Sequence, residues 1–120
     1  MTNDASCTHF DPRPLRDSVS DDAEILDQLV GLFRETAAVH IAEIEAAARA
    51  GDVATLRDRA HALKGSLGVF RAQPALDLCV AVEQAAKTSP PTIARDEIAR
   101  LVAELAALDA ELRVVFPAAG

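Results

Sequence analysis

Residues 52–70 read DVATLRDRAHALKGSLGVF and carry a clear helical pattern from which the rest of the fold can be predicted. Its apolar residues recur at intervals of three and four positions, which places them on one face of an α-helix. They are Val53, Leu56, Ala60, Leu63, Leu67 and Phe70. Asp52, directly before them, is a favourable N-cap residue. The spacing therefore predicts a helix over residues 53–70 whose apolar face belongs to a core.

The preceding segment predicts a long helix that begins near Ser20 and stops at Gly51. Ser20 is a favourable N-cap, and the acids that follow it suit the positive end of a helix dipole. Glycine is the residue type that most often ends a helix. The expected apolar stripe of this helix is Ile25, Leu29, Leu32 or Phe33, Ala37, Ile41, Ile44 and Ala48.

Two more helices are predicted after this stretch. One begins between Ala72 and Ala75, because Pro74 suits a first helical turn, and it ends at the turn of residues 88–91. Its apolar positions are Ala75, Leu78 or Cys79, Val82 and Ala86. The last helix ends before Pro117. It carries Ile98, Leu101, Leu105, Leu108, Leu112 and Val115.

Four amphipathic helices joined by short turns, without any segment of strand-like alternation, predict an all-α fold. The expected architecture is an antiparallel up-down-up-down four-helix bundle over residues 20–117. Residues 1–19 are expected to form a flexible leader and a short N-terminal segment, with at most a turn of helix at 12–18. Phe10 and Leu15 are the candidate anchors of this extension on the bundle.

Composition narrows the function classes. The chain has 120 residues, 50% of them hydrophobic, which fits one globular domain. Its net charge of -7 argues against nucleic acid or anionic lipid as the main partner. It contains neither a long apolar run nor a signal-peptide pattern, so we expect a soluble cytoplasmic protein. Cys7 and Cys79 predict neither a disulfide framework nor a zinc site.

A second line of residues on the 53–70 helix lies off its apolar face. It consists of Arg57, His61, Lys64, Gly65 and Gly68. At 3.6 residues per turn, both glycines lie within about 40° of His61 around the axis. Each glycine costs about 1 kcal/mol relative to alanine in a helix interior. Two explanations remain open, close packing of another helix or an open floor beside the imidazole, and we favour the second.

The surroundings of His61 suit nucleophilic chemistry. A neutral imidazole is a nucleophile, and a neighbouring cation such as Lys64 stabilises a phosphoryl group added to it. Ser66 offers a hydroxyl in the next turn. Basic residues also outnumber acids within residues 57–71, which predicts an acidic partner surface.

Residues 61–66, HALKGS, resemble the H-x-L-K-G-S signature of histidine-containing phosphotransfer (HPt) domains, the relay proteins of multistep two-component phosphorelays. The likeness extends over most of the chain, through similar offsets elsewhere. It includes Leu32-Phe33, the Gly51-Asp52 turn, Ala72, Leu78, Val82 and Glu83.

The resemblance implies an exposed, phospho-accepting His61 with Lys64 near the phosphoryl group and Gly65 leaving room for the partner. It also implies that Glu83 orients the imidazole so that phosphorylation falls on the outward ring nitrogen. The alternative for Glu83 is a solvated carboxylate at the bundle edge. Arg71 departs from the family, which usually has glycine there, and this leaves the course of the helix end open.

The remaining candidates predict no second site. His9 is expected in the leader and His40 on the outer half of the first long helix, without compact ligand spacing to Cys7 or Cys79. We therefore expect no metal site. Cys79 is expected to be a small buried residue. The acids of the first long helix read as a solvated face. They are Asp21, Asp22, Glu24, Asp27, Glu43 and Glu45.

Two function hypotheses follow. The leading one is a monomeric phosphocarrier, not an enzyme, that relays a phosphoryl group between receiver-domain aspartates through His61. Its partners would be response-regulator receiver domains and a hybrid histidine kinase. The chain has no phosphate-binding loop for ATP and no cofactor, and the receiver is expected to supply Mg²⁺. The alternative is a four-helix interaction module whose basic strip binds an acidic protein without phosphoryl chemistry.

Overall fold

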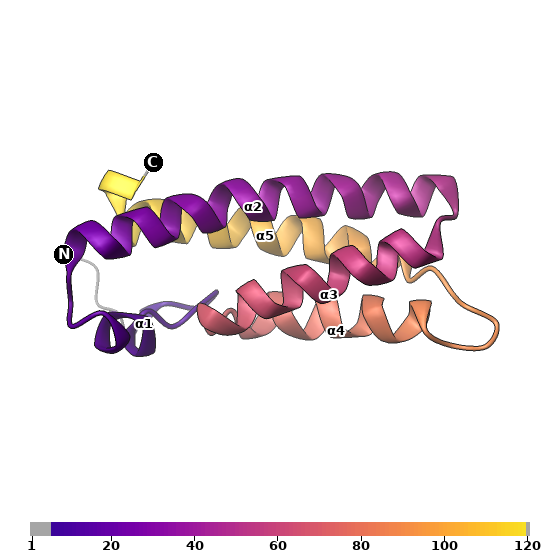
Figure 1. Ribbon diagram of the computed structural model, residues 1–120, viewed down its shortest axis with the longest axis horizontal. Coiled ribbons are helices and arrows are strands. Elements are labelled where there is room, and N and C mark those ends of the chain that lie inside the picture. Colours follow the sequence, from indigo (N-terminus) through magenta and orange to yellow (C-terminus); the bar gives the residue numbers. More distant parts are fainter. Residues whose placement is uncertain (1–5, 120) are drawn as a thin grey trace.

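The computed structural model describes residues 6–119, which form an antiparallel helical bundle (Figure 1). A short helix α1 (Arg13–Ser18) precedes the long helix α2 (Ala23–Ala50). Helices α3 (Val53–Val69), α4 (Gln73–Ala86) and α5 (Arg95–Val115) follow, and a 3-10 turn, η2 (Pro117–Ala119), comes after α5. No strand occurs within the described residues, so the predicted all-α bundle with a short N-terminal helix is confirmed.

The bundle has two pairs of helices. Figure 1 shows α2 and α5 along one edge and α3 and α4 along the other. The most extensive contacts join α3 to α4 and α2 to α3, whereas α2 and α5 contact each other less. This arrangement leaves the α3–α4 edge and the α2–α5 edge on opposite sides of the molecule.

Aspartates are the N-cap residues of α2 and α3. The carboxylate of Asp52 accepts a hydrogen bond from the backbone N–H of Thr55 at 3.1 Å, as predicted for the start of α3. The predicted start of α2 at Ser20 is wrong. Ser20 and Asp21 have φ of 53° and 59°, a left-handed conformation that cannot enter a helix. Asp22 is extended and caps α2 instead, accepting from the N–H of Ile25 at 3.1 Å.

The buried face of α2 differs from the predicted stripe in its first half. Ile25, Leu29 and Leu32 are exposed, whereas the residue that follows each of them in the chain is buried. The buried residues of α2 are Leu26, Val30, Phe33, Ala37, Ile44, Ala47 and Ala48. The rings of Phe33 and Phe70 pack with centroids 4.4 Å apart, which fixes the rotation of α2 against the end of α3.

The other helices bury most of the predicted positions, with Leu105 and Val115 of α5 half-buried. Five of the six apolar residues of the 53–70 stretch are buried, and Val53, at the first turn, is half-buried. Cys79 is buried as predicted, and its thiol donates to the carbonyl oxygen of Ala60 at 3.1 Å. Burial raises the pKa of this thiol to about 12, so Cys79 acts as a small core residue.

The N-terminal extension packs on α5. Phe10 and Leu15 are buried, which confirms them as anchors. The backbone N–H groups of Thr8 and His9 donate to the carboxylate of Glu111 at 3.0 and 2.9 Å. The expectation of a flexible leader is therefore corrected for residues 6–11, which these contacts tie to the bundle. The rest of that predicted leader, residues 1–5, lies outside the described residues.

The turn between α3 and α4 sets how these two helices face each other. The N–H of Arg71 donates to the carbonyl of Gly68 at 3.2 Å, and the N–H of Ala72 donates to the carbonyl of Leu67 at 3.0 Å. This pair of bonds is a Schellman motif, which requires one left-handed residue. Arg71 takes that conformation with φ of 51°. This position therefore favours glycine, and Arg71 occupies it in a conformation that is strained for a residue with a side chain.

None of the helices formed by residues 6–119 has the length and apolar character needed to cross a membrane.

Candidate functional site

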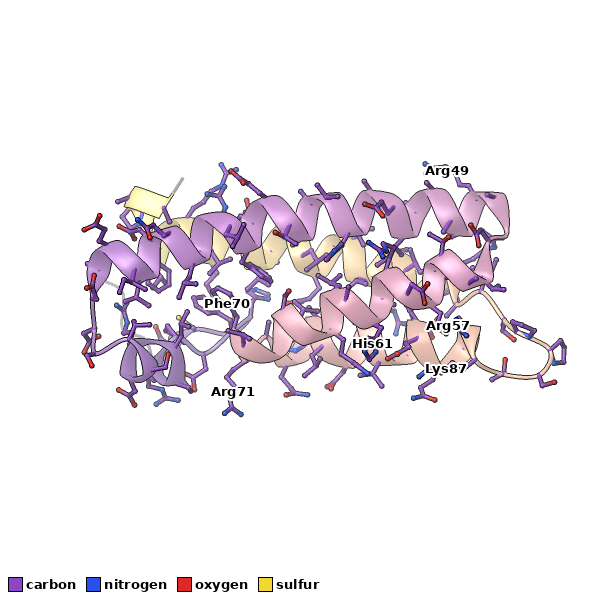
Figure 2. All side chains as sticks on the ribbon, viewed as in Figure 1. Arg49, Arg57, His61, Phe70, Arg71 and Lys87 are labelled. Carbon is purple, nitrogen blue, oxygen red and sulfur yellow. The ribbon has the colours of Figure 1, made fainter. Side chains whose placement is uncertain are left out.

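His61 lies in the middle of α3, on the side of the helix opposite its buried face. Its neighbours along the chain, Ala60 and Ala62, are buried and half-buried, whereas the side chain of His61 is 68% exposed. Figure 2 shows Arg57, His61 and Lys87 together on the edge of the bundle formed by α3 and α4. One edge of the imidazole is therefore open to a partner.

Glu83 of α4 holds the other edge of the imidazole. Its side chain is 1% exposed, so the alternative of a solvated carboxylate at the bundle edge is wrong. Oε2 of Glu83 lies 2.8 Å from Nδ1 of His61. The hydrogen bond crosses from one helix to the next and fixes the orientation of the ring, as expected for an imidazole-orienting residue.

Glu83 stays charged although it is buried. The hydrogen bond from Lys64 is the largest cause, and with His61 and Lys87 it outweighs desolvation and lowers the pKa of Glu83 from 4.5 to about 2. At neutral pH this carboxylate only accepts hydrogen bonds. The proton of the neutral imidazole must therefore lie on Nδ1, which leaves the Nε2 lone pair on the exposed edge.

Two ammonium groups share the same carboxylate. Nζ of Lys64 donates to Oε1 of Glu83 at 2.6 Å, and Nζ of Lys87 lies 3.2 Å from Oε2. Lys64 comes from α3, one turn after His61, and Lys87 follows the end of α4. A buried carboxylate with an imidazole and two cations around it has a net positive environment, which suits the arrival of an anion beside the ring.

A shallow hollow of about 420 Å³ lies beside the imidazole. It is lined by Arg57, Asp58, His61, Glu83 and Lys87. Nε of Arg57 lies 3.6 Å from the carboxylate of Asp58, and both side chains are largely exposed. The structure thus brings Arg57 to the imidazole, as its spacing on α3 predicts.

The two glycines of α3 face open space. A Cβ atom built on Gly65 or Gly68 would meet no atom within 4 Å. This excludes close packing of another helix within the described residues as the reason for these glycines. The open-floor explanation is the one that the geometry supports, since side chains at these positions would project over the surface next to His61.

Ser66 is placed differently from the rest of the predicted strip. It is half-buried and lies about 140° around α3 from His61. It follows Arg59 by two helical turns, and Arg59 reaches Glu43 of α2 at 3.6 Å. Ser66 therefore lies on the side of α3 toward α2, and its part in partner binding stays a prediction.

Lys87 is the site residue that sequence reasoning missed. A local signal was present, because residues four apart on a helix are neighbours and Glu83 and Lys87 have the favourable order of charges. The burial of Glu83, by contrast, follows from a cross-helix contact.

The remaining titratable candidates lie elsewhere. Nδ1 of His9 pairs with Glu104 at 2.6 Å on α5, and His40 is half-buried on α2 with its Nδ1 unbonded. Within residues 6–119, no group of three or more His, Cys, Asp or Glu side chains is arranged to hold a metal ion.

A comparison with protein families agrees with this arrangement. The family model described as Hpt domain matches residues 28–111, a span of 84 residues (111 − 28 + 1) that contains α3, α4 and all the residues around His61. Neither the curated proteins nor the solved structures include a match to the chain.

Proposed function

This chain belongs to the Hpt domain family, whose members carry out histidine phosphotransfer in two-component signalling, and we propose that it relays a phosphoryl group between receiver-domain aspartates through His61. The observation that carries the proposal is the pairing of an exposed imidazole edge with a buried carboxylate. Nδ1 of His61 is held by Glu83, so the nucleophilic nitrogen faces outward.

In the transfer step, the only atom of this chain that forms or breaks a bond to phosphorus is Nε2 of His61. Nε2 of His61 attacks the phosphorus of an aspartyl phosphate, the N–P bond forms, and the P–O bond to the aspartate breaks with the carboxylate as leaving group. The Nδ1 proton stays on the ring and donates to Glu83, which balances the positive charge that the ring acquires. The reverse step passes the phosphoryl group to the aspartate of another receiver.

Lys64 and Lys87 are placed to stabilise the phosphorylated form. A phosphoryl group brings a charge near -2 beside Glu83, where these two ammonium groups already lie. The Lys64 side chain is 31% exposed, which leaves room for its Nζ to turn from Glu83 toward a phosphoryl oxygen. We expect both ammonium groups to lower the free energy of phosphorylated His61.

Partner docking uses the open surface of α3. Gly65 and Gly68 leave the space beside the imidazole free, and Val69 adds an exposed apolar side chain one turn further. The basic residues around His61 complement the acidic pocket that a receiver aspartate requires, and the receiver supplies Mg²⁺. In this proposal the chain is a cytoplasmic, monomeric phosphocarrier that works with receiver domains and a hybrid histidine kinase.

The test is incubation of the chain with a phosphorylated receiver domain, followed by intact-mass analysis. We expect the mass of one added phosphoryl group, labile in acid and persistent in base. His61→Gln should abolish the adduct, while His9→Gln and His40→Gln serve as matched controls that keep it. Receiver binding without any transfer would instead support the interaction-module alternative and refute the phosphocarrier.

A further inference from the structure

A second concave site lies on the opposite edge of the bundle, between α2 and α5. It encloses about 490 Å³, which is within the range of small-molecule sites. Neither His61 nor any residue that contacts it lines this groove. Its occupancy is therefore a separate question from phosphotransfer.

One end of the groove is apolar. Ile41 of α2 and Val102 and Leu105 of α5 form its walls, and the small side chains of Ala38 and Ala106 keep it open. Along α2 the lining runs from position 31 to position 41, a length of about 15 Å at the helical rise. This length suits an extended chain or a flat ring.

The other end of the groove carries two guanidinium groups on a single carboxylate. Nε of Arg34 donates to Asp109 at 2.6 Å, and Nε of Arg113 donates to the other oxygen of Asp109 at 2.9 Å. The Nη nitrogens of both arginines make no hydrogen bond with any of residues 6–119. The Arg34 side chain is only 17% exposed and lines a buried wall of the groove, whereas the Arg113 side chain is 66% exposed and reaches the groove from the surface of α5.

Charge at this end is balanced by a residue on the rim. Glu35 also lines the groove, and its side chain is exposed, so water screens it more than it screens Arg34. The carbonyl oxygen of Ala119 would lie 2.9 Å from a Cβ atom on Gly31, so η2 closes this end of the groove. Unused guanidinium donors next to an apolar channel select an anionic head group on an apolar body.

We propose that the α2–α5 groove binds a small organic carboxylate whose apolar chain or ring lies along Ile41 and Leu105 while its head group contacts Arg34 and Arg113. The recognised chemistry is a planar carboxylate on a body of about eight carbons. Binding at this edge leaves the imidazole edge of α3 and α4 free.

The test is a titration of the full chain with sodium octanoate, in which the amide chemical shifts of the protein are measured by NMR. For a ligand of ten heavy atoms we expect saturable binding with Kd on the order of 1 mM, with shifts confined to α2, α5 and η2. Octanol and octylammonium, which lack the carboxylate, should bind at least tenfold more weakly. Equal binding of octanol would overturn the proposed head-group recognition.

Variants at exposed positions distinguish octanoate binding in the groove from non-specific hydrophobic binding. Arg113→Ala should weaken octanoate binding five- to tenfold, whereas Arg100→Ala, on the same helix outside the groove, should not change it. Ala106→Phe should fill the groove and abolish binding, with Ala103→Phe as its matched control.

Replacement of Glu35, on the rim of the groove, tests whether the bound head group is negatively charged. Glu35→Gln should tighten octanoate binding about two- to threefold, because it removes a like charge near the head group. All five variants change exposed side chains, so we expect each to fold. Absent binding, or equal loss in Ala106→Phe and Ala103→Phe, would refute the site whatever the outcome of the phosphotransfer assay.

Discussion

Replacement of Glu83 by glutamine should remove a contribution to stability that depends on pH. In the folded chain the pKa of this carboxyl is lowered from 4.5 to about 2, chiefly by the hydrogen bond from Lys64. The difference between these two pKa values corresponds to about 3 kcal/mol of stability, at about 1.36 kcal/mol for each pKa unit. Lys64 and Lys87 are partly exposed, so solvent screening reduces the expected value to about 2 kcal/mol.

The sign of the effect follows from the direction of the shift. Because the folded pKa lies below the unfolded one, the stabilisation is fully present above about pH 5. It is lost progressively as the pH falls from about 4.5 through the folded pKa of about 2, below which the carboxyl is protonated in both states. The stability difference between wild type and Glu83→Gln should therefore shrink across this interval.

Urea unfolding at pH 7, 5, 4 and 3 measures this difference directly. Glu45→Gln provides a control, because Glu45 makes no hydrogen bond or ion pair within residues 6–119. The substitution removes the same formal charge as Glu83→Gln. A wild-type advantage over Glu83→Gln that stayed constant from pH 7 to pH 3 would refute the reasoning. So would an equal pH-dependent loss in Glu45→Gln, since the effect would then belong to net charge.

Three further predictions concern α3 and its ends. Gly65→Gln should keep or raise stability by several tenths of a kcal/mol, because no atom crowds that position, while transfer to His61 falls sharply; destabilisation in urea with normal transfer would contradict the open floor. Lys64→Ala should lower the transfer rate tenfold or more at saturating receiver and cost about 1 to 2 kcal/mol in stability, and an unchanged saturating rate with weaker binding would place the lysine in docking instead. Arg71→Gly should raise the free energy of unfolding by about 0.5 to 1 kcal/mol by relieving a left-handed residue, whereas Gly51→Ala, at the equivalent position after α2, should lower it by about 1 kcal/mol; thermal unfolding of both variants decides, and a loss in Arg71→Gly would refute the strain.

Helix α3 could be predicted from local pattern alone, because its apolar residues occupy one register and its polar strip another. The first half of α2 could not. Residues 25, 29 and 32 and residues 26, 30 and 33 are both spaced by three and four, so each set makes an amphipathic helix. The choice between them depends on non-local contacts such as that of Phe33 with Phe70, which lies far away in sequence.

The candidate site shows the same division between local and non-local information. His61 and its glycines share one helix, so their proximity follows from helical geometry. Glu83 sits next to the core residue Val82, and by local pattern a carboxylate there should reach water. It is buried because Lys64 and His61 meet it from another helix. That compensation requires the relative register of α3 and α4, which periodicity does not contain.

The register itself comes from the turn that joins α3 to α4. His61 lies eight residues before the end of α3, about 12 Å along its axis, and Glu83 lies ten residues after the start of α4, about 15 Å along its axis. These lengths nearly match, so the carboxylate returns to the level of the imidazole only if the reversal is tight. The Schellman bonds of Arg71 and Ala72 make it tight, and the contact of the Phe70 ring with Phe33 holds the turn against α2. An extra residue within α4 ahead of Glu83 would rotate Glu83 by about 100° around the helix axis and carry it away from His61. The geometry that leaves the outward nitrogen of His61 free therefore depends on a short buried turn as much as on the residues around the imidazole.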